Sequence, residues 1–279
     1  MIHKINWNIS GAFCKHKVII DFFTDNNLFH AFNSISVYDG VSRCKWNGGR
    51  MHYDNPPKNE IKEDYYRLGW GINLTFSNFE IDISDPLGNS LLEEFHREGN
   101  GIILVNEELR KHIRQNFPKY KLIHSVTGCG LVQELPLRDE DVLFYKRLEE
   151  KYDLIIPRCG SSFDKKLRML DRDKVEIMVN DTCILNCPVY HNHFEMIGEA
   201  NRKGSEWDDS IAECFIEKGT FEEVTRREKR ILGKNYPFDF GTQGILRLLD
   251  EGFYNFKIAG RDETKVNFTE DLRNNLIYG

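Results

Sequence analysis

Short apolar, β-branched runs recur along the chain, and each is followed by a stretch with apolar residues three and four positions apart. The first pattern predicts a strand and the second predicts a helix that buries one face. Eight runs are of the strand type, at 4–10, 34–40, 71–78, 101–106, 121–128, 153–160, 174–180 and 254–260. Helix candidates between them include 91–99, 106–117, 138–152 and 242–253. This alternation predicts parallel strands joined by helical crossovers.

The spacing of these units predicts one closed barrel. The fourth to seventh strands begin 20 to 32 residues apart, which accommodates a strand, a helix and two short loops. Eight such units in 279 residues match the size and element count of a (β/α)8 TIM-like barrel. We therefore expect residues 1–279 to form a single barrel domain with a long insertion between the seventh and eighth strands.

Two connections are longer than a simple barrel needs, and both follow strands, where barrel enzymes carry their sites. Residues 41–70 separate the second strand from the third, and residues 181–253 separate the seventh from the eighth. The first contains Trp46-Asn-Gly-Gly-Arg50, whose glycines permit positive φ. This stretch is interpreted either as a backbone nest for an anion or as a plain tight turn.

Cysteines in these two connections are candidate metal ligands. Cys183 and Cys187 follow the seventh strand, Cys44 follows the second, and Cys214 lies in the long insertion. Four thiolates on one face suit an iron–sulfur cluster or a structural zinc ion. Cys159, at the end of the sixth strand, is an alternative to Cys44 or Cys214. The alternative interpretation is that these cysteines are simply buried in the core and bind no metal.

A second ligand set lies within one loop. Cys183, Cys187, His191 and His193 have the residue types of a Cys2His2 zinc site. His191 and His193 are two positions apart, so they would point to different faces of a helix, and they would converge only in an extended loop. The four-cysteine set is therefore preferred. Seven cysteines, an odd number, do not suggest a disulfide framework, so a reducing compartment is expected.

Polar residues at the ends of other predicted strands are candidates for catalysis. His124 ends the fifth strand, Arg158 the sixth, and Arg261 follows the eighth, while Asp181 follows the seventh. His124 and Asp181 would move protons, and the two arginines would bind a carboxylate or phosphate. The alternative for each is a side chain that fixes a loop by hydrogen bonds to the backbone.

Charge and hydropathy exclude several classes of protein. The balance of 38 Lys and Arg against 44 Asp and Glu gives a net charge of −6, which argues against a broadly basic nucleic-acid-binding surface. The basic stretch 225–234 is interpreted mainly as the solvent-exposed face of a helix. Contact with RNA or phosphate is the less favoured interpretation. No leader or run of about 20 apolar residues is present, so we expect a cytoplasmic protein without a membrane span.

The residues around these cysteines resemble a known family. The stretches 153–158, 175–187 and 253–261, with the cysteine and arginine loop at 37–50, are similar to the collagenase-like peptidase family, family thirty-two among peptidases of unknown type. That family also includes tRNA hydroxylation proteins and oxygen-independent ubiquinone hydroxylation proteins. The resemblance implies a barrel that holds a [4Fe–4S] cluster on Cys44, Cys183, Cys187 and Cys214. This chain departs from many relatives by having three residues, not six, between its paired cysteines.

Three functional hypotheses follow. The preferred one is an iron–sulfur barrel enzyme, or a subunit that works with a partner subunit, for oxygen-independent hydroxylation-type modification of RNA or a small aromatic substrate. The second is a Zn2+-dependent hydrolase or peptidase that uses the cysteine and histidine set. The third is a noncatalytic binding protein in which the metal only fixes the long loop.

Overall fold

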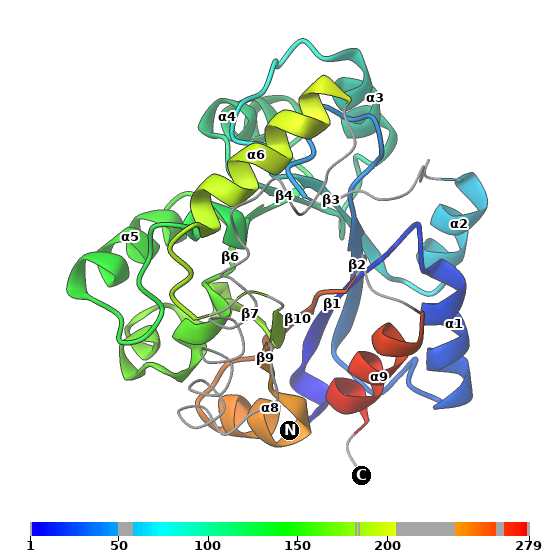
Figure 1. The fold of residues 1–279 in the computed structure, drawn as a ribbon. Helices are drawn as coiled ribbons and strands as arrows, with labels where there is room; N and C mark the ends of the chain where they lie inside the picture. Colours follow the sequence, from blue (N-terminus) through cyan, green and yellow to red (C-terminus); the bar gives the residue numbers. More distant parts are fainter. Residues whose placement is uncertain are drawn as a thin grey trace.

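The computed structural model describes residues 2–49, 58–181, 183, 185–204, 238–260 and 265–277. Eight parallel strands form one sheet, in the order β6-β5-β4-β3-β2-β1-β10-β7. Their bounds are β1 Asn6–Ser10, β2 Ser34–Asp39, β3 Gly71–Phe76, β4 Gly101–Leu104, β5 Lys121–His124, β6 Leu154–Ile155, β7 Glu176–Met178 and β10 Asn255–Ile258. A parallel bridge between Ile155 and Val175 joins the two outer strands and closes the ring (Figure 1).

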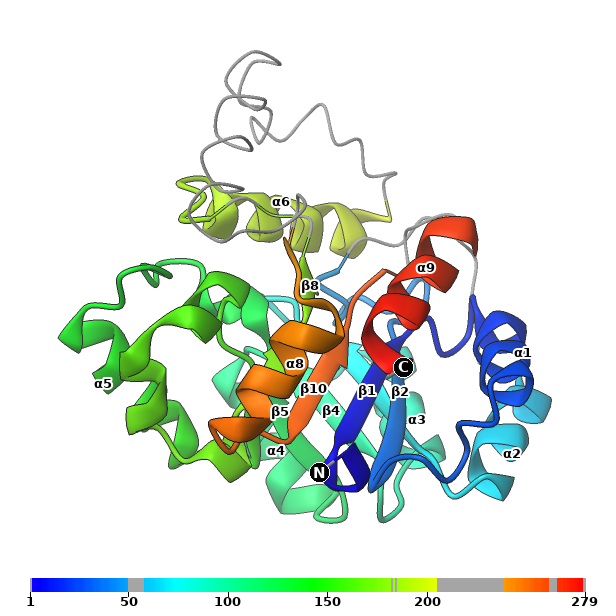
Figure 2. The same cartoon turned by 90° about the horizontal axis from the view of Figure 1, so that it is seen from below.

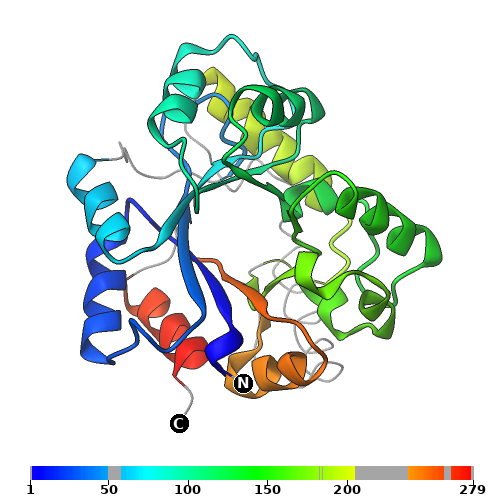
Figure 3. The same cartoon turned by 180° about the vertical axis from the view of Figure 1, so that it is seen from behind.

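Helices surround the strand ring on the outside (Figure 3). They are α1 His16–Asp25, α2 Asn59–Arg67, α3 Pro86–Glu94, α4 Glu107–Asn116, α5 Asp139–Glu149, α8 Gly241–Asp250 and α9 Lys265–Leu276. The (β/α)8 prediction is confirmed, with each predicted strand run containing one barrel strand. No described helix is long and apolar enough to cross a membrane.

Local sequence explains where the helices begin. Asn106 caps α4, because its side-chain oxygen accepts hydrogen bonds from the N–H groups of Glu108 and Leu109. Asp85 caps α3 in the same way, directly before Pro86, which suits the first helical turn. The connection between β6 and β7 has three short 3-10 helices in place of an α-helix.

Helix α6 (Tyr190–Lys203) lies over the end of the barrel at which the strands finish (Figure 2). Two amide side chains attach it to the loop after β2. Asn78 donates to the carbonyl oxygens of Lys45 and Gly198, both at 2.9 Å. Asn201 donates to those of Asn47 and Gly49, also at 2.9 Å. A short antiparallel pair, β8 (Asn180–Asp181) and β9 (Phe238–Asp239), continues the chain beyond β7.

One glycine in the loop after β2 is explained by the close approach of another backbone segment, and not by a positive φ. Gly48 does not adopt a left-handed conformation. Among the described residues 41–49 of this loop, Arg43 does, with φ of 66°. A Cβ atom at Gly48 would lie 2.2 Å from the carbonyl oxygen of Ser77. Trp46 packs beside it, fully buried, with its ring edge-on to Phe76. Close packing against the backbone of Ser77, and not the backbone conformation, therefore requires a glycine at position 48.

We predict that Gly48→Ala lowers the free energy of unfolding by roughly 1–3 kcal/mol, because the new methyl group would force backbone atoms apart. Gly204→Asn is the matched control. Gly204 ends α6 with φ of 65° and has open space around its Cα, and Asn tolerates this conformation. Urea unfolding of both variants checks the prediction. Equal stability of Gly48→Ala and the natural chain would contradict it.

Candidate functional site

A buried arginine forms the centre of the site at the carboxyl-terminal face. Arg158 follows β6, is only 1% exposed, and forms an ion pair with Glu134 from the connection between β5 and α5. Its guanidinium carbon lies 3.4 Å from the ring centroid of Tyr190, the first residue of α6. A fully charged group at this depth requires such compensation, since a lone buried charge is strongly unfavourable.

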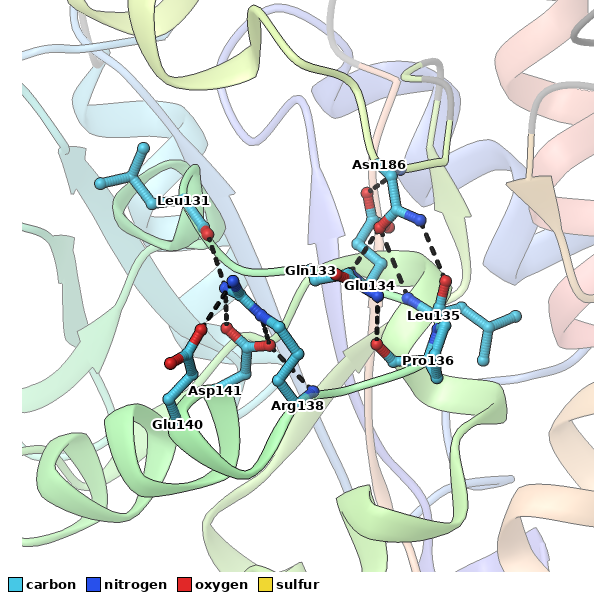
Figure 4. Close-up of polar contacts among 9 residues, drawn as sticks. All are labelled: Leu131, Gln133, Glu134, Leu135, Pro136, Arg138, Glu140, Asp141 and Asn186. Carbon is cyan, nitrogen blue, oxygen red and sulfur yellow. Dashed lines mark hydrogen bonds and ion pairs between the residues drawn. The ribbon is translucent and has the colours of Figure 1, made fainter.

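Glu134 connects three loops through its carboxylate. One oxygen accepts a hydrogen bond from the N–H of Gly160 at 2.8 Å, and the other accepts one from the N–H of Asn186 at 3.0 Å. The Asn186 side chain returns the contact by accepting from the N–H of Glu134 and donating to the carbonyl oxygen of Leu135 (Figure 4). The loop after β7 is thereby bound to the loop after β5.

Burial changes the titration of this carboxyl group. Removal from water raises the pKa of Glu134 to about 7, and Asp181 adds to the rise, although the positive charge of Arg158 opposes it. Arg158 itself keeps its charge, because guanidinium groups do not lose their proton in proteins. Its Nε atom is buried and has no hydrogen-bond partner among the residues that the structure describes.

Cys183 and Cys187 lie together beside this ion pair. The neighbouring Cys187 side chain, together with burial, raises the pKa of Cys183 far above its usual value. Both cysteines belong to a small apolar cluster with Tyr190, separate from the main core. Asp181 supports the turn, because its carboxylate accepts a hydrogen bond from the N–H of Cys183 at 3.0 Å. Two of the four proposed cysteine ligands are therefore adjacent.

The other two proposed ligands are not gathered with them in the described part of the chain. Cys44 is buried in the main core, where desolvation raises the pKa of its thiol to about 12. Cys214 lies outside the described residues, as do Arg261 and the basic stretch 225–234. Within residues 2–49, 58–181, 183, 185–204, 238–260 and 265–277, no three His, Cys, Asp or Glu side chains form a group suited to a metal ion.

The residues of the alternative zinc set point to different neighbours. His191 makes an ion pair with Glu195, at 3.3 Å, and packs edge-on against Phe79. His193 is buried and stacks on Phe194. Cys159, the substitute ligand of the cysteine set, donates its thiol hydrogen to the carbonyl oxygen of Met178 at 3.2 Å.

His124 faces the helix layer. Its ring packs edge-on against Tyr152 and Phe144, on or just after α5, at centroid distances of 5.0 and 6.4 Å. Complete desolvation lowers the pKa of His124 to about 3, so the ring is neutral at ordinary pH. His124 therefore lies against α5, whereas Arg158 and Asp181 lie beside the cysteine loop.

Sequence reasoning missed Glu134 and Tyr190. Glu134 lies within a loop and not at the end of a strand, and its partner Arg158 is 24 residues away in the sequence. Tyr190 carries no signal that separates it from other aromatic core residues.

The pKa of Glu134 gives a testable dependence of stability on pH. A carboxyl group whose pKa is higher in the fold than its usual 4.5 stabilises the fold fully below pH 4.5 and loses that contribution as pH rises through about 7. We predict that the natural chain loses about 3 kcal/mol relative to Glu134→Gln between pH 4 and pH 8. Denaturant unfolding at both values of pH checks this, and a constant difference would contradict the raised pKa.

Comparisons with known proteins support the fold. No family model matches the chain, and no curated protein matches it. Among solved structures it is similar to that of the U32 peptidase Mk0906, with a TM-score of 0.53 and 13% sequence identity over 92% of this chain and 93% of that chain. At this level of identity, the similarity extends to a common barrel architecture and to no further property.

Proposed function

We propose that the chain is an iron–sulfur enzyme, or the iron–sulfur subunit of one, which modifies RNA or a small aromatic substrate without dioxygen. The observation that carries this proposal is that Cys183 and Cys187 share one small packing cluster at the carboxyl-terminal face. Two soft donors in one cluster are suited to bind one thiophilic metal centre. Cys44 and Cys214 complete the proposed ligand set, as the family resemblance implies.

The described residues fit such a cluster in part. Cys183 and Cys187 are adjacent. The positive charge of Arg158 only partly opposes the rise in the pKa of the Cys183 thiol that Cys187 and burial cause. Cys44 belongs to a different packing cluster, in a loop that Asn78 and Asn201 attach to α6. Cys159 is the substitute ligand, because its thiol contacts the last residue of β7, Met178.

The protein's own residues have distinct proposed roles. When bound, the cluster would supply single electrons or a Lewis acid at the carboxyl-terminal end of the barrel. Arg158, committed to Glu134 and Tyr190, positions the cysteine loop rather than touching substrate. Asp181, at intermediate exposure beside Cys183, is the group placed to exchange a proton with a substrate.

Ligand variants test the cluster directly. We predict that Cys183→Ser and Cys187→Ser each lose most of the iron and acid-labile sulfide of protein purified without oxygen. Cys129→Ala is the control, because Cys129 is buried, as Cys187 is, but contacts the carbonyl oxygen of Ile156 instead of the cysteine loop. Retention of iron and sulfide in both serine variants would contradict the proposal.

A second comparison separates the cysteine set from the zinc set. Under the proposal, Cys44→Ser or Cys214→Ser lowers bound metal while His191→Ala leaves it unchanged. The reverse result, with zinc in place of iron and sulfide, would indicate the local Cys2His2 site and redirect assays towards hydrolysis. Peptide cleavage, the activity named for the solved U32 peptidase, would then be measured with the zinc-loaded protein.

A further inference from the structure

The inner face of the barrel is polar on strands that lie one and two places apart in the sheet. Asn8 of β1 donates to both carboxylate oxygens of Glu176 of β7, at 3.1 and 3.3 Å. Asn73 of β3 donates to Asn8 at 3.1 Å and to Ser36 of β2 at 3.2 Å. Because β1, β3 and β7 are not neighbours in the sheet, these contacts pass through the barrel interior.

A lysine completes this network. Lys257 of β10 pairs with Asn8 in the sheet register, so its side chain shares the inner face. It is 4% exposed, and its Nζ lies 3.5 Å from the ring centroid of Tyr38. Tyr38 pairs with Ser10, two residues beyond Asn8, so the lysine side chain extends towards the carboxyl-terminal end of the barrel. Its charge acts on Glu176, which is also influenced by Lys121.

Two hydroxyl groups at the same end have no partner. Ser10 is 0% and Thr75 6% exposed, and neither Ser10 Oγ nor Thr75 Oγ1 has a hydrogen bond to any described residue. Ser10 lies two positions after Asn8, and Thr75 two positions after Asn73, so both face inward. Buried polar groups are normally paired, and an unpaired set on one inner face therefore indicates a missing partner.

We propose that Lys257 captures the carbonyl group of a small oxo compound as a Schiff base, with Ser10 and Thr75 binding oxygen atoms of that compound. The ammonium group first gives a proton to the Glu176 carboxylate, and the neutral amine then attacks the carbonyl carbon. The Glu176 carboxyl returns the proton to the carbinolamine hydroxyl, which leaves as water while the C=N bond forms. No oxidant or metal is required, so the proposal is independent of the cysteine loop.

The electrostatic influence of Lys257 on Glu176 suits this proton exchange. Burial raises the pKa of Glu176, so proton transfer between the two side chains avoids maintaining two separated charges in the interior. The chain contains a close comparison in Lys62, which is 9% exposed, forms an ion pair with Glu94 and lies 5.2 Å from the ring centroid of Phe95. Lys62 is on helix α2, away from the two unpaired hydroxyl groups.

Reductive trapping on the full chain tests the proposal. Native protein is incubated with pyruvate and sodium cyanoborohydride, and labelled lysines are identified by peptide mass spectrometry. We expect Lys257 to be labelled at least about tenfold faster than Lys62 and the exposed Lys17. Labelling that is no faster at Lys257 than at these two lysines would overturn the proposal.

Variants of the hydroxyl groups add a readout that a structural lysine would not give. We expect Ser10→Ala and Thr75→Val each to slow trapping at Lys257 between about two- and tenfold, the range of one hydrogen bond, without altering the circular dichroism spectrum. Glu176→Gln is expected to slow trapping further, because it removes the proton acceptor. Unchanged trapping in the folded Ser10→Ala and Thr75→Val variants would refute the assigned ligand contacts.

Discussion

The buried ion pair between Arg158 and Glu134 is the interaction on which the arrangement of the carboxyl-terminal face depends. Removal of the Arg158 side chain from such a pair typically costs about 3–5 kcal/mol, because Glu134 then stays buried without its partner. The pair joins the loops after β5 and β6, and the backbone of Asn186 extends it to the loop after β7. Tyr190 then stacks on the guanidinium group and fixes the start of α6. The position of the two adjacent cysteines follows from this one pair.

The strands were predictable because each is a short apolar run bounded by polar or glycine residues. Pairing of these strands in sequence-predicted parallel units gives the expected barrel. The connection between β6 and β7 was less predictable, since its sequence forms only 3-10 helices there. Strand-end reasoning located Arg158, Asp181 and the cysteine pair. The same reasoning did not show which face of β5 its last residue would occupy, because successive side chains of a strand point to opposite faces. In the structure the His124 ring lies against Phe144 of α5.

Partners distant in sequence were beyond reach. Glu134 meets Arg158 only because the barrel places two loops side by side, and no local pattern marks that acid. The same limit applies to the interior, where Asn8 and Glu176 are 168 residues apart. In the sequence, the polar residues of the inner face are part of the usual alternation of polar and apolar side chains along each strand. They come together only because the strands close into a ring. The barrel thus carries two chemically distinct sets of residues at one end, a thiol pair in a loop and a lysine inside.

X-ray absorption at the iron and zinc edges, on full-length protein purified without oxygen, tests the central claim most directly. The account predicts an iron signal with sulfur atoms in the nearest shell and further iron atoms beyond them, as expected for a cluster on cysteine ligands. A zinc signal with mixed sulfur and nitrogen neighbours, or iron surrounded by nitrogen and oxygen alone, would contradict it.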